Sequence, residues 1–150
     1  MAYEENPRTR EVMDLVYHAL SEKGFEPIPQ LVGYLLSNDT VYITNHNNAK
    51  SMIRKVDRDE FLDELLQMYF YNRGKTTYKN NTKVRETLYS VYDILAELKY
   101  NDPTFPMWDY LRSGDPGAVT GRNNARSKIE EVERDEILEE LLKMYFSKTV

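Results

Sequence analysis

The sequence predicts an all-α protein with two homologous halves, of four to five helices each, packed against each other as an intramolecular pseudo-dimer. Two observations predict this fold. Residues 58–70 (RDEFLDELLQMYF) return as residues 134–146 (RDEILEELLKMYF), with ten of the thirteen positions identical. Apolar side chains recur at the three- and four-residue spacing of amphipathic helices, whereas no useful length of chain alternates with the period of two that strands require.

The repeat covers most of the chain. Other matching segments are 16–20 with 91–95, 33–39 with 109–115, and 47–51 with 123–127. The offset is 76 residues from Pro27 and Pro103 onward and 75 residues before them. Two copies are too few for a solenoid, which needs about three repeats. A half of about 75 residues rarely gains more than about 3–5 kcal/mol from its own core, so we expect each half to bury apolar surface against the other.

Each helix of the first copy has its own signals. The expected helices run over residues 8–23, 30–37, about 46–56 and 58–70. Gly24 fits the position that ends the first helix, and Pro27 with Pro29 bracket a turn before the second. Asp57 and Glu60 fit the N-cap and N3 positions of the last helix. We also consider that residues 46–58 run on as a nearly continuous helix.

The second copy repeats this order after a polar linker. Its helices are expected near residues 83–98, 105–112, 121–131 and 133–147. Asn, Thr and Gly are frequent before residue 83, where Thr82 is expected to cap the next helix. The sequence therefore predicts a first copy over residues 1–72, a linker over 73–82 and a second copy over 83–150.

Composition and charge argue against several classes of protein. The chain has no cysteine, which excludes disulfide frameworks and thiolate sites for metals or redox chemistry. A signal-peptide pattern and an apolar run of membrane-spanning length are both missing, which predicts a cytoplasmic protein without membrane insertion. The net charge of −5 argues against nucleic-acid binding. That function remains an alternative through Arg122–Arg126 (RNNAR), a segment that fits a nucleic-acid groove.

Residue patterns that carry catalysis or bind metals are scarce. The histidines are His18 and His46, and the sequence has no Gly-rich phosphate loop, nucleophile elbow or catalytic triad. Acidic clusters at residues 57–64 and 133–140 begin the two last helices, where carboxylates oppose the helix dipole and cap free N–H groups. We therefore expect no enzymatic activity, no catalytic residue, no metal and no cofactor.

A basic cluster before the last helix of the first copy differs between the copies. Its members are Lys50, Arg54, Lys55 and Arg58, and the second copy has Arg126, Glu130, Glu131 and Arg134 at these positions. On a continuous helix, residues four apart would form one basic ridge. Such a ridge would attract acidic protein surfaces or phosphate. Alternatively, it is an ordinary solvated face whose arginines pair with neighbouring acids.

An unusual order of segments in the first copy points to a known family. It includes Val16–Phe25, Pro27, Gln30–Ser37, Tyr42-Ile43, Arg58–Glu60 and Glu64-Leu65. Residues 10–70 as a whole closely resemble the IreB/ReoM family of regulatory phosphoproteins. The second copy resembles the family more weakly, through Val84–Leu88, Ser113–Pro116 and Arg134–Glu136.

The resemblance implies a function without catalysis. Members are small helical homodimers of Gram-positive bacteria, phosphorylated on threonine by a membrane Ser/Thr kinase that senses the cell wall. Through this switch they control the proteolytic turnover of an enzyme that commits precursors to peptidoglycan. The resemblance therefore implies a fused, single-chain version of the dimer that works as a monomeric chain. Its expected partners are proteins, among them a Ser/Thr kinase and a protease or its substrate.

The chain departs from the family pattern at two places. The family phosphorylates a threonine in the N-terminal tail, but residues 1–7 contain none, and Thr76 and Thr77 in the linker are the nearest equivalents. The family's Arg-His pair is Asn45-His46 here and Gly121-Arg122 in the second copy. The predicted partner-binding residues are His46, Lys50, Arg54, Lys55, Arg58, Arg122 and Arg126. Alternatively, the threonines are ordinary linker residues and the protein is a structural scaffold without a switch.

Overall fold

A computed structural model describes residues 4–75 and 78–147, and within them it contains helices and no strand. The predicted all-α class is therefore confirmed. The first copy contains α1 (Pro7–Glu22), α2 (Pro27–Ser37), η1 (Thr40–Tyr42), η2 (His46–Asn48), α3 (Ala49–Ile53) and α4 (Arg58–Tyr71). The second contains α5 (Thr82–Glu97), α6 (Thr104–Ser113), η3 (Pro116–Ala118), η4 (Arg122–Asn124), α7 (Ala125–Ile129) and α8 (Arg134–Phe146).

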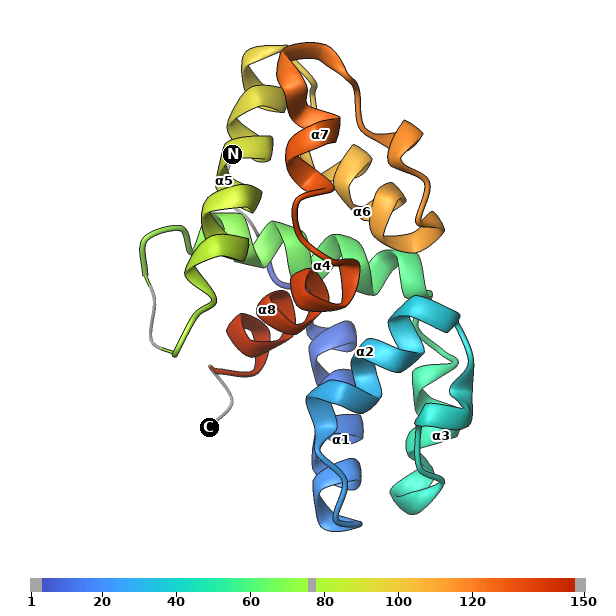
Figure 1. Cartoon of the computed structure of the whole chain (residues 1–150). Helices are drawn as coiled ribbons and strands as arrows, with labels where there is room; N and C mark the ends of the chain where they lie inside the picture. Colours follow the sequence, from blue (N-terminus) through green and yellow to red (C-terminus); the bar gives the residue numbers. More distant parts are fainter. Residues whose placement is uncertain (1–3, 76–77, 148–150) are drawn as a thin grey trace.

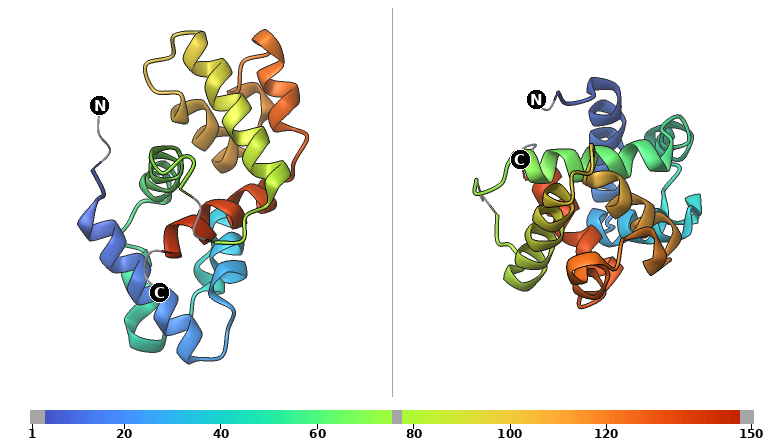
Figure 2. Two further views of the ribbon diagram at one scale, coloured as in Figure 1. Left: turned by 90° about the vertical axis from the view of Figure 1, so that its left-hand side faces the viewer. Right: turned by 90° about the horizontal axis from the view of Figure 1, so that it is seen from above.

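The last helix of each copy packs on the other copy. Within each copy, the first helix lies against the short third helix, as α1 does with α3 and α5 with α7. In contrast, α4 packs on α6, α8 packs on α2, and α4 and α8 contact each other at the centre (Figure 1). The side view in Figure 2 shows α4 lying between the layer of α1–α3 and the layer of α5–α7. This reciprocal exchange is the predicted intramolecular pseudo-dimer.

Equivalent aromatic pairs occur on both sides of the junction. Phe146 of α8 lies against Tyr17 of α1 with ring centroids 4.4 Å apart. Phe70 of α4 stacks on Tyr92 of α5 at 4.2 Å. Since both pairs cross from one copy to the other and occupy matching positions in the repeat, they show that the two halves are related by approximate symmetry. Such pairs add about 0.5–1.5 kcal/mol each beyond the area they bury.

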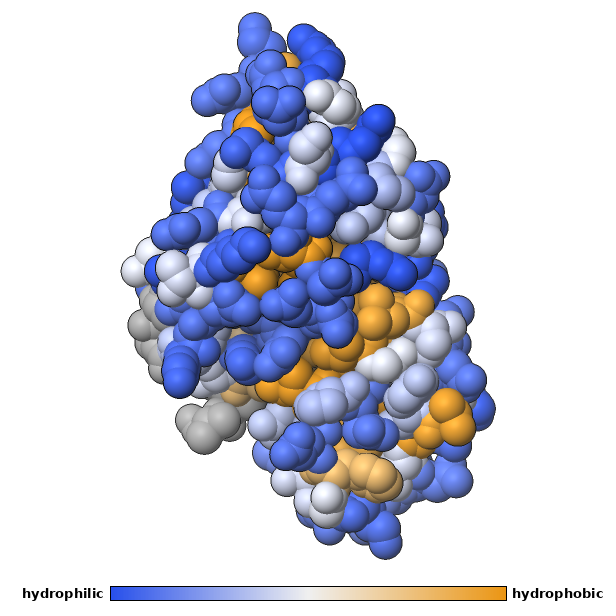
Figure 3. Space-filling view, viewed as in Figure 1, coloured by the Kyte–Doolittle hydropathy of each residue, from blue (hydrophilic) through white to orange (hydrophobic). Residues whose placement is uncertain are grey.

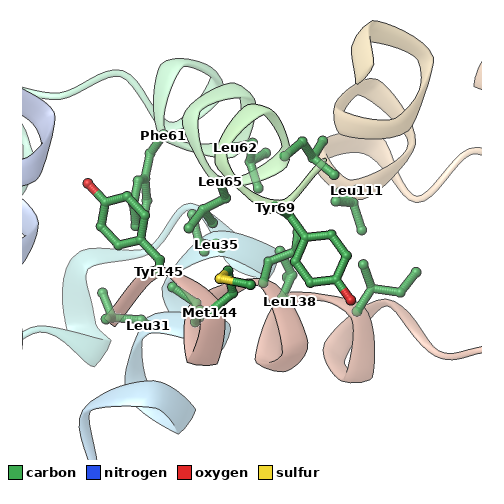
Figure 4. Packing of buried hydrophobic residues seen from close by; sticks show 14 of the residues in the cluster. Leu31, Leu35, Phe61, Leu62, Leu65, Tyr69, Leu111, Leu138, Met144 and Tyr145 are labelled. Atoms are coloured by element: carbon green, nitrogen blue, oxygen red, sulfur yellow. The ribbon is translucent and has the colours of Figure 1, made fainter. Parts of the chain in front are cut away.

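One apolar core extends through both copies where α4 and α8 meet (Figure 4). Phe61, Leu65 and Tyr69 of α4 are at most 1% exposed, as are Leu138 and Tyr145 of α8. Burying a side chain of this size contributes roughly 1.5–3 kcal/mol. In contrast, the outward side of α2 carries partly buried apolar residues, and Figure 3 shows apolar residues in a band across the middle of this face.

The second helix begins earlier than predicted. The sequence indicated a turn at Pro27 and Pro29, whereas α2 already starts at Pro27. Proline is tolerated in the first helical turn because the N–H it lacks has no intrahelical acceptor there. Gly24 does adopt the expected left-handed conformation after α1, with φ of +84°.

The predicted nearly continuous helix over residues 46–58 is wrong. Asn47 and Asn48 adopt left-handed conformations with φ of +52° and +62°, and α3 covers only Ala49–Ile53. Asp57 is extended and accepts a hydrogen bond from the Asp59 N–H, so that α4 starts afresh at Arg58. Asparagine tolerates the left-handed region better than most residues, which allows this break. The predicted helix over 121–131 is interrupted in the same way at Asn123 and Asn124.

A buried carboxylate holds the end of the linker. Glu140 of α8 is 1% exposed and accepts hydrogen bonds from the Tyr69 hydroxyl at 2.9 Å, the Tyr78 hydroxyl at 2.8 Å and the Asn81 N–H at 2.9 Å. Burial and the Glu140 carboxylate raise the pKa of Tyr69, which keeps its hydroxyl a donor. Asn81, rather than the predicted Thr82, caps α5 by accepting from the Val84 N–H. The contact joins α4 of the first copy, the linker and α8 of the second.

The first copy contains a related contact. Glu64 of α4 is 6% exposed and accepts from the Asn6 N–H at 2.9 Å, just before α1. Tyr145 lies beside it under the Arg10 guanidinium, which is 3.6 Å from the ring centroid. Both carboxylates belong to the acidic clusters that the sequence assigned to helix-dipole and capping roles. Their burial shows instead that they fasten the start of each copy to its last helix.

Residues 1–72 produced alone are expected to fold only as a dimer, because α4 would otherwise expose the apolar face that packs on α6 and α8. On dilution into the low micromolar range, the fragment should lose helical circular dichroism, whereas the full chain should not. Size-exclusion chromatography with light scattering gives the mass at each concentration. A fragment that stays helical and monomeric at high dilution would contradict this dependence.

Tyr78→Phe is expected to lower the free energy of unfolding by about 1–3 kcal/mol, because it removes a hydrogen bond to a buried carboxylate. Urea denaturation followed by circular dichroism measures the change. Tyr100→Phe is the matched control, since Tyr100 is 40% exposed. Equal stabilities of the two variants would show that the Tyr78 contact contributes nothing.

Candidate partner-binding groove

An open groove of about 1170 Å³ surrounds the turn between α3 and α4. Its charged lining residues are Arg8, Asp39, Arg54, Lys55, Asp57, Arg58, Asp59, Glu60 and Arg112. Arg54 and Lys55 follow α3, Arg58 begins α4, and Arg8 lies in the first turn of α1. Arg112 comes from α6, so both copies contribute to the groove. We call this surface the basic groove.

Arg58 has a structural role at the wall of the basic groove. Its Nη1 donates to the Leu35 carbonyl at 3.1 Å, near the end of α2. The equivalent Arg134 donates to the Leu111 carbonyl at 3.0 Å. Hydrogen bonds from a charged donor contribute about 1.5–3 kcal/mol. An arginine therefore recurs at this position because it attaches the last helix of each copy to the second helix of the same copy.

Arg54 and Lys55 are the cations of the turn that remain available. Both are exposed, and the Arg54 guanidinium donates to the Thr40 hydroxyl at 3.0 Å. Within residues 4–75 and 78–147, no carboxylate forms an ion pair with Arg8, Arg54 or Lys55. An incoming acidic group would therefore not have to displace an existing ion pair from these side chains.

The acids of the basic groove are largely engaged. Asp39 accepts a hydrogen bond from the Val41 N–H, and Asp57 accepts one from the Asp59 N–H, both at 2.9 Å. The Asp59 carboxylate accepts from the Arg112 Nη1 at 3.2 Å across the junction of the copies. Arg112 also pairs with Asp109 of its own helix. Arg112 balances the charge of Asp59, whereas the hydrogen bonds to Asp39 and Asp57 leave their negative charges in place beside the five cations of the groove.

The structure separates the predicted binding residues into groups. Arg54, Lys55 and Arg58 line the basic groove, but His46 and Lys50 do not. The Nε2 of His46 lies 3.0 Å from Glu22 Oε2 of α1. The basic ridge therefore does not exist as one helical face, because Lys50 lies in α3, Arg54 and Lys55 follow its end at Ile53, and Arg58 begins α4. The break at Asn47 and Asn48 separates only His46 from this cluster. Thr76 and Thr77 lie outside the described residues.

In the second copy, the Arg126 guanidinium is occupied by the fold. Its Nε donates to the carbonyls of Pro116 and Val119 at 3.1 and 2.9 Å. Arg122 is exposed on the preceding short helix. Arg126 thus supports the loop before α7 through its Nε, and this structural role accounts for the residue without a nucleic-acid contact, which weakens the alternative based on the RNNAR segment.

Arg8 and Arg112 are lining residues that the sequence reasoning missed. Arg8 lies at the start of α1, far from the turn in the sequence. Arg112 occupies the position equivalent to Leu36, so a comparison of the copies does reveal a change from an apolar residue to a cation. Only the exchange of the last helices shows that this cation faces the groove of the other copy.

Metal-binding clusters and membrane-spanning helices are both missing from the described part of the chain. It contains no group of three or more His, Cys, Asp or Glu residues arranged to hold a metal ion. Among its helices, none combines the length and apolar character needed to cross a membrane.

Comparisons with known proteins match the duplication. The family model described as IreB regulatory phosphoprotein matches twice, over residues 1–71 and 73–147. A "UPF0297 protein" of Lachnoclostridium phytofermentans is 54% identical over 66 residues, 44% of this chain and 75% of the relative. A "UPF0297 protein" of Ruminiclostridium cellulolyticum is 48% identical over 71 residues, 47% of this chain and 81% of the relative. No solved structure matches the chain significantly. With both of its halves matched, the chain belongs to the IreB family of regulatory phosphoproteins.

Proposed function

We propose that the chain is a non-enzymatic regulatory protein that binds a protein partner through the basic groove. The observation that carries this proposal is the position of Arg54 and Lys55. Both cations are exposed at the edge of a groove, without an ion pair among the described residues, in a family described as regulatory phosphoproteins. The second copy has Glu130 and Glu131 at these positions, so partner binding belongs to the first copy.

The second copy then has mainly a structural role. Its α6 receives α4, and its α8 completes the core of the first copy against α2. Because one chain supplies both halves of the pseudo-dimer, the functional unit is a monomeric chain. The partner's surface carries carboxylates or phosphates, since these groups pair with arginine and lysine.

Control by phosphorylation extends the proposal. A Ser/Thr kinase phosphorylates Thr76 or Thr77, which adds a charge of about −1.5 to −2 at neutral pH. Tyr78, the next residue in the sequence, donates to the buried carboxylate of Glu140. By resemblance to the family, the regulated process is the proteolytic turnover of an enzyme of cell-wall precursor synthesis.

The double variant Arg54→Glu with Lys55→Glu reverses the charge of both exposed cations. It is expected to lower recovery of the bound partner about 10-fold or more. The measurement is affinity capture from a lysate of Gram-positive cells, with quantitative mass spectrometry. Arg122→Glu with Lys128→Glu is the matched control, because it reverses two cations on the second copy. Arg58 is left unchanged, since its loss would disturb the attachment of α4 to α2.

Two results would contradict the groove assignment. Unchanged capture by the Arg54 and Lys55 variant would remove the basic groove from the function. Loss of capture by the Arg122 and Lys128 variant alone would move partner binding to the second copy. Thermal unfolding of every variant, followed by circular dichroism, shows whether a loss of capture reflects a loss of fold.

Phosphorylation of the linker is tested with a Ser/Thr kinase of the type that senses the cell wall. Incubation with the kinase and ATP is expected to place phosphate on Thr76 or Thr77, and mass spectrometry of the peptides locates it. Replacing both threonines by alanine should abolish the modification. A linker that stays unmodified, or a modification at threonines elsewhere, would favour the structural scaffold without this switch.

A further inference from the structure

The pseudo-dimer contains a second groove at the position equivalent to the basic groove. It has a volume of about 310 Å³ and surrounds the turn between α7 and α8. Tyr110 and Arg134 line it as Tyr34 and Arg58 line the basic groove. In a dimer of identical copies the two grooves would be the same. Here they differ, and the difference follows from a few positions.

Each copy contributes one residue to the other copy's groove, and this residue is apolar in one groove and basic in the other. Leu36 of α2 lines the second groove, whereas its equivalent, Arg112 of α6, lines the basic groove. Arg112 is held in place by Asp59, by Asp109 and by the ring of Trp108, whose centroid is 5.4 Å from its Cζ. Two carboxylates partly balance the charge of Arg112, but 38% of its side chain stays exposed, so the second copy contributes a positioned cation to the basic groove.

The two grooves also differ in the number of charged residues that line them. Five basic and four acidic residues line the basic groove, whereas one basic and three acidic residues line the second groove. Glu130, Glu133 and Asp135 are the acids of the second groove, and Arg134 is its basic residue. Arg134 donates to the Leu111 carbonyl as Arg58 does to the Leu35 carbonyl, so the described lining of the second groove has no counterpart of the exposed Arg54 and Lys55.

We propose that each chain binds one acidic polypeptide segment, in the basic groove alone, and that Arg112 of the second copy is a specificity-determining residue for this segment. The inference rests on the proposed function and gives the partner a chemistry and a stoichiometry. The cations come from three separate parts of the chain, namely α1, the turn before α4 with the start of α4, and α6. An extended segment with several carboxylates fits this distribution better than a single phosphate does.

The surrounding charge argues against a polyanion with the density of nucleic acid. Glu60 and the engaged acids Asp39, Asp57 and Asp59 lie among the cations, and the whole chain carries a net charge of −5. A nucleic acid has one phosphate for every short step along its backbone and would meet these carboxylates. A polypeptide can place its acidic side chains opposite the cations and leave other positions neutral.

The test uses the full chain and a fluorescein-labelled peptide of ten residues in which glutamate alternates with glycine. Fluorescence anisotropy at low salt, about 20 mM, limits screening of the charges. We expect saturation at one peptide per chain. Arg112→Leu, which introduces the residue that α2 carries at this position, is expected to weaken binding about three- to tenfold, and Arg112→Lys should weaken it less.

Arg122→Leu is the matched control, since it removes one exposed positive charge outside the groove. If it weakens binding as much as Arg112→Leu does, binding follows net charge and the proposal is overturned. Saturation at two peptides per chain would overturn the restriction to one groove. Thermal unfolding of Arg112→Leu by circular dichroism verifies that the variant is folded.

Failure of this inference and failure of the proposed function give different results. If Arg54→Glu with Lys55→Glu abolishes capture of the natural partner while Arg112→Leu changes neither capture nor peptide binding, the partner uses the groove without Arg112. If capture depends on the groove but the glutamate peptide does not bind, the partner's segment is not acidic. Either result overturns the inference and leaves the proposed function intact.

Discussion

The structure depends on the exchange of the last helix between the two copies. Both α4 and α8 pack on the second helix of the other copy, and they also contact each other at the centre. Each helix therefore buries apolar side chains on several sides. A half of this size rarely gains much stability from its own core, so we expect the fold of each copy to depend on the other. The second copy must therefore keep its core, while its surface is free to change. The two grooves reflect this difference between core and surface.

Much of the fold follows from the sequence for a physical reason. Helices with a strong apolar period can bury their apolar side in few ways, and nearly identical last helices in both copies indicate that the same packing occurs twice. The family resemblance then identifies that packing as a dimer. Sequence comparison also singled out Arg54 and Lys55 as candidates, because a reversal of charge between copies stands out against an unchanged core. Their grouping into a groove could not be derived from helical spacing.

The features that the sequence did not reveal depend on tertiary contacts. The left-handed Asn47 and Asn48 break a segment that helix propensity alone would allow to continue. In the sequence, Glu140 is one of several acids in the early turns of a helix. Its role depends on the Tyr69 and Tyr78 hydroxyls, which are distant in the sequence and donate to it in the fold. A close contact explains Gly33, where a Cβ would lie 2.6 Å from the Tyr42 ring; the second copy has Asp109 and Ala118 at these positions. Such paired changes become interpretable only once the neighbours are known.

The covalent link between the copies has an evolutionary consequence. Two separate, diverging subunits would assemble into three kinds of dimer, and two of these would carry a matched pair of grooves. A tether of the length seen here keeps its own partner at an effective concentration in the millimolar range, far above that of any free competitor. The link therefore makes the mixed assembly obligatory. Gene fusion allows one half to specialise in recognition while the other becomes its permanent scaffold.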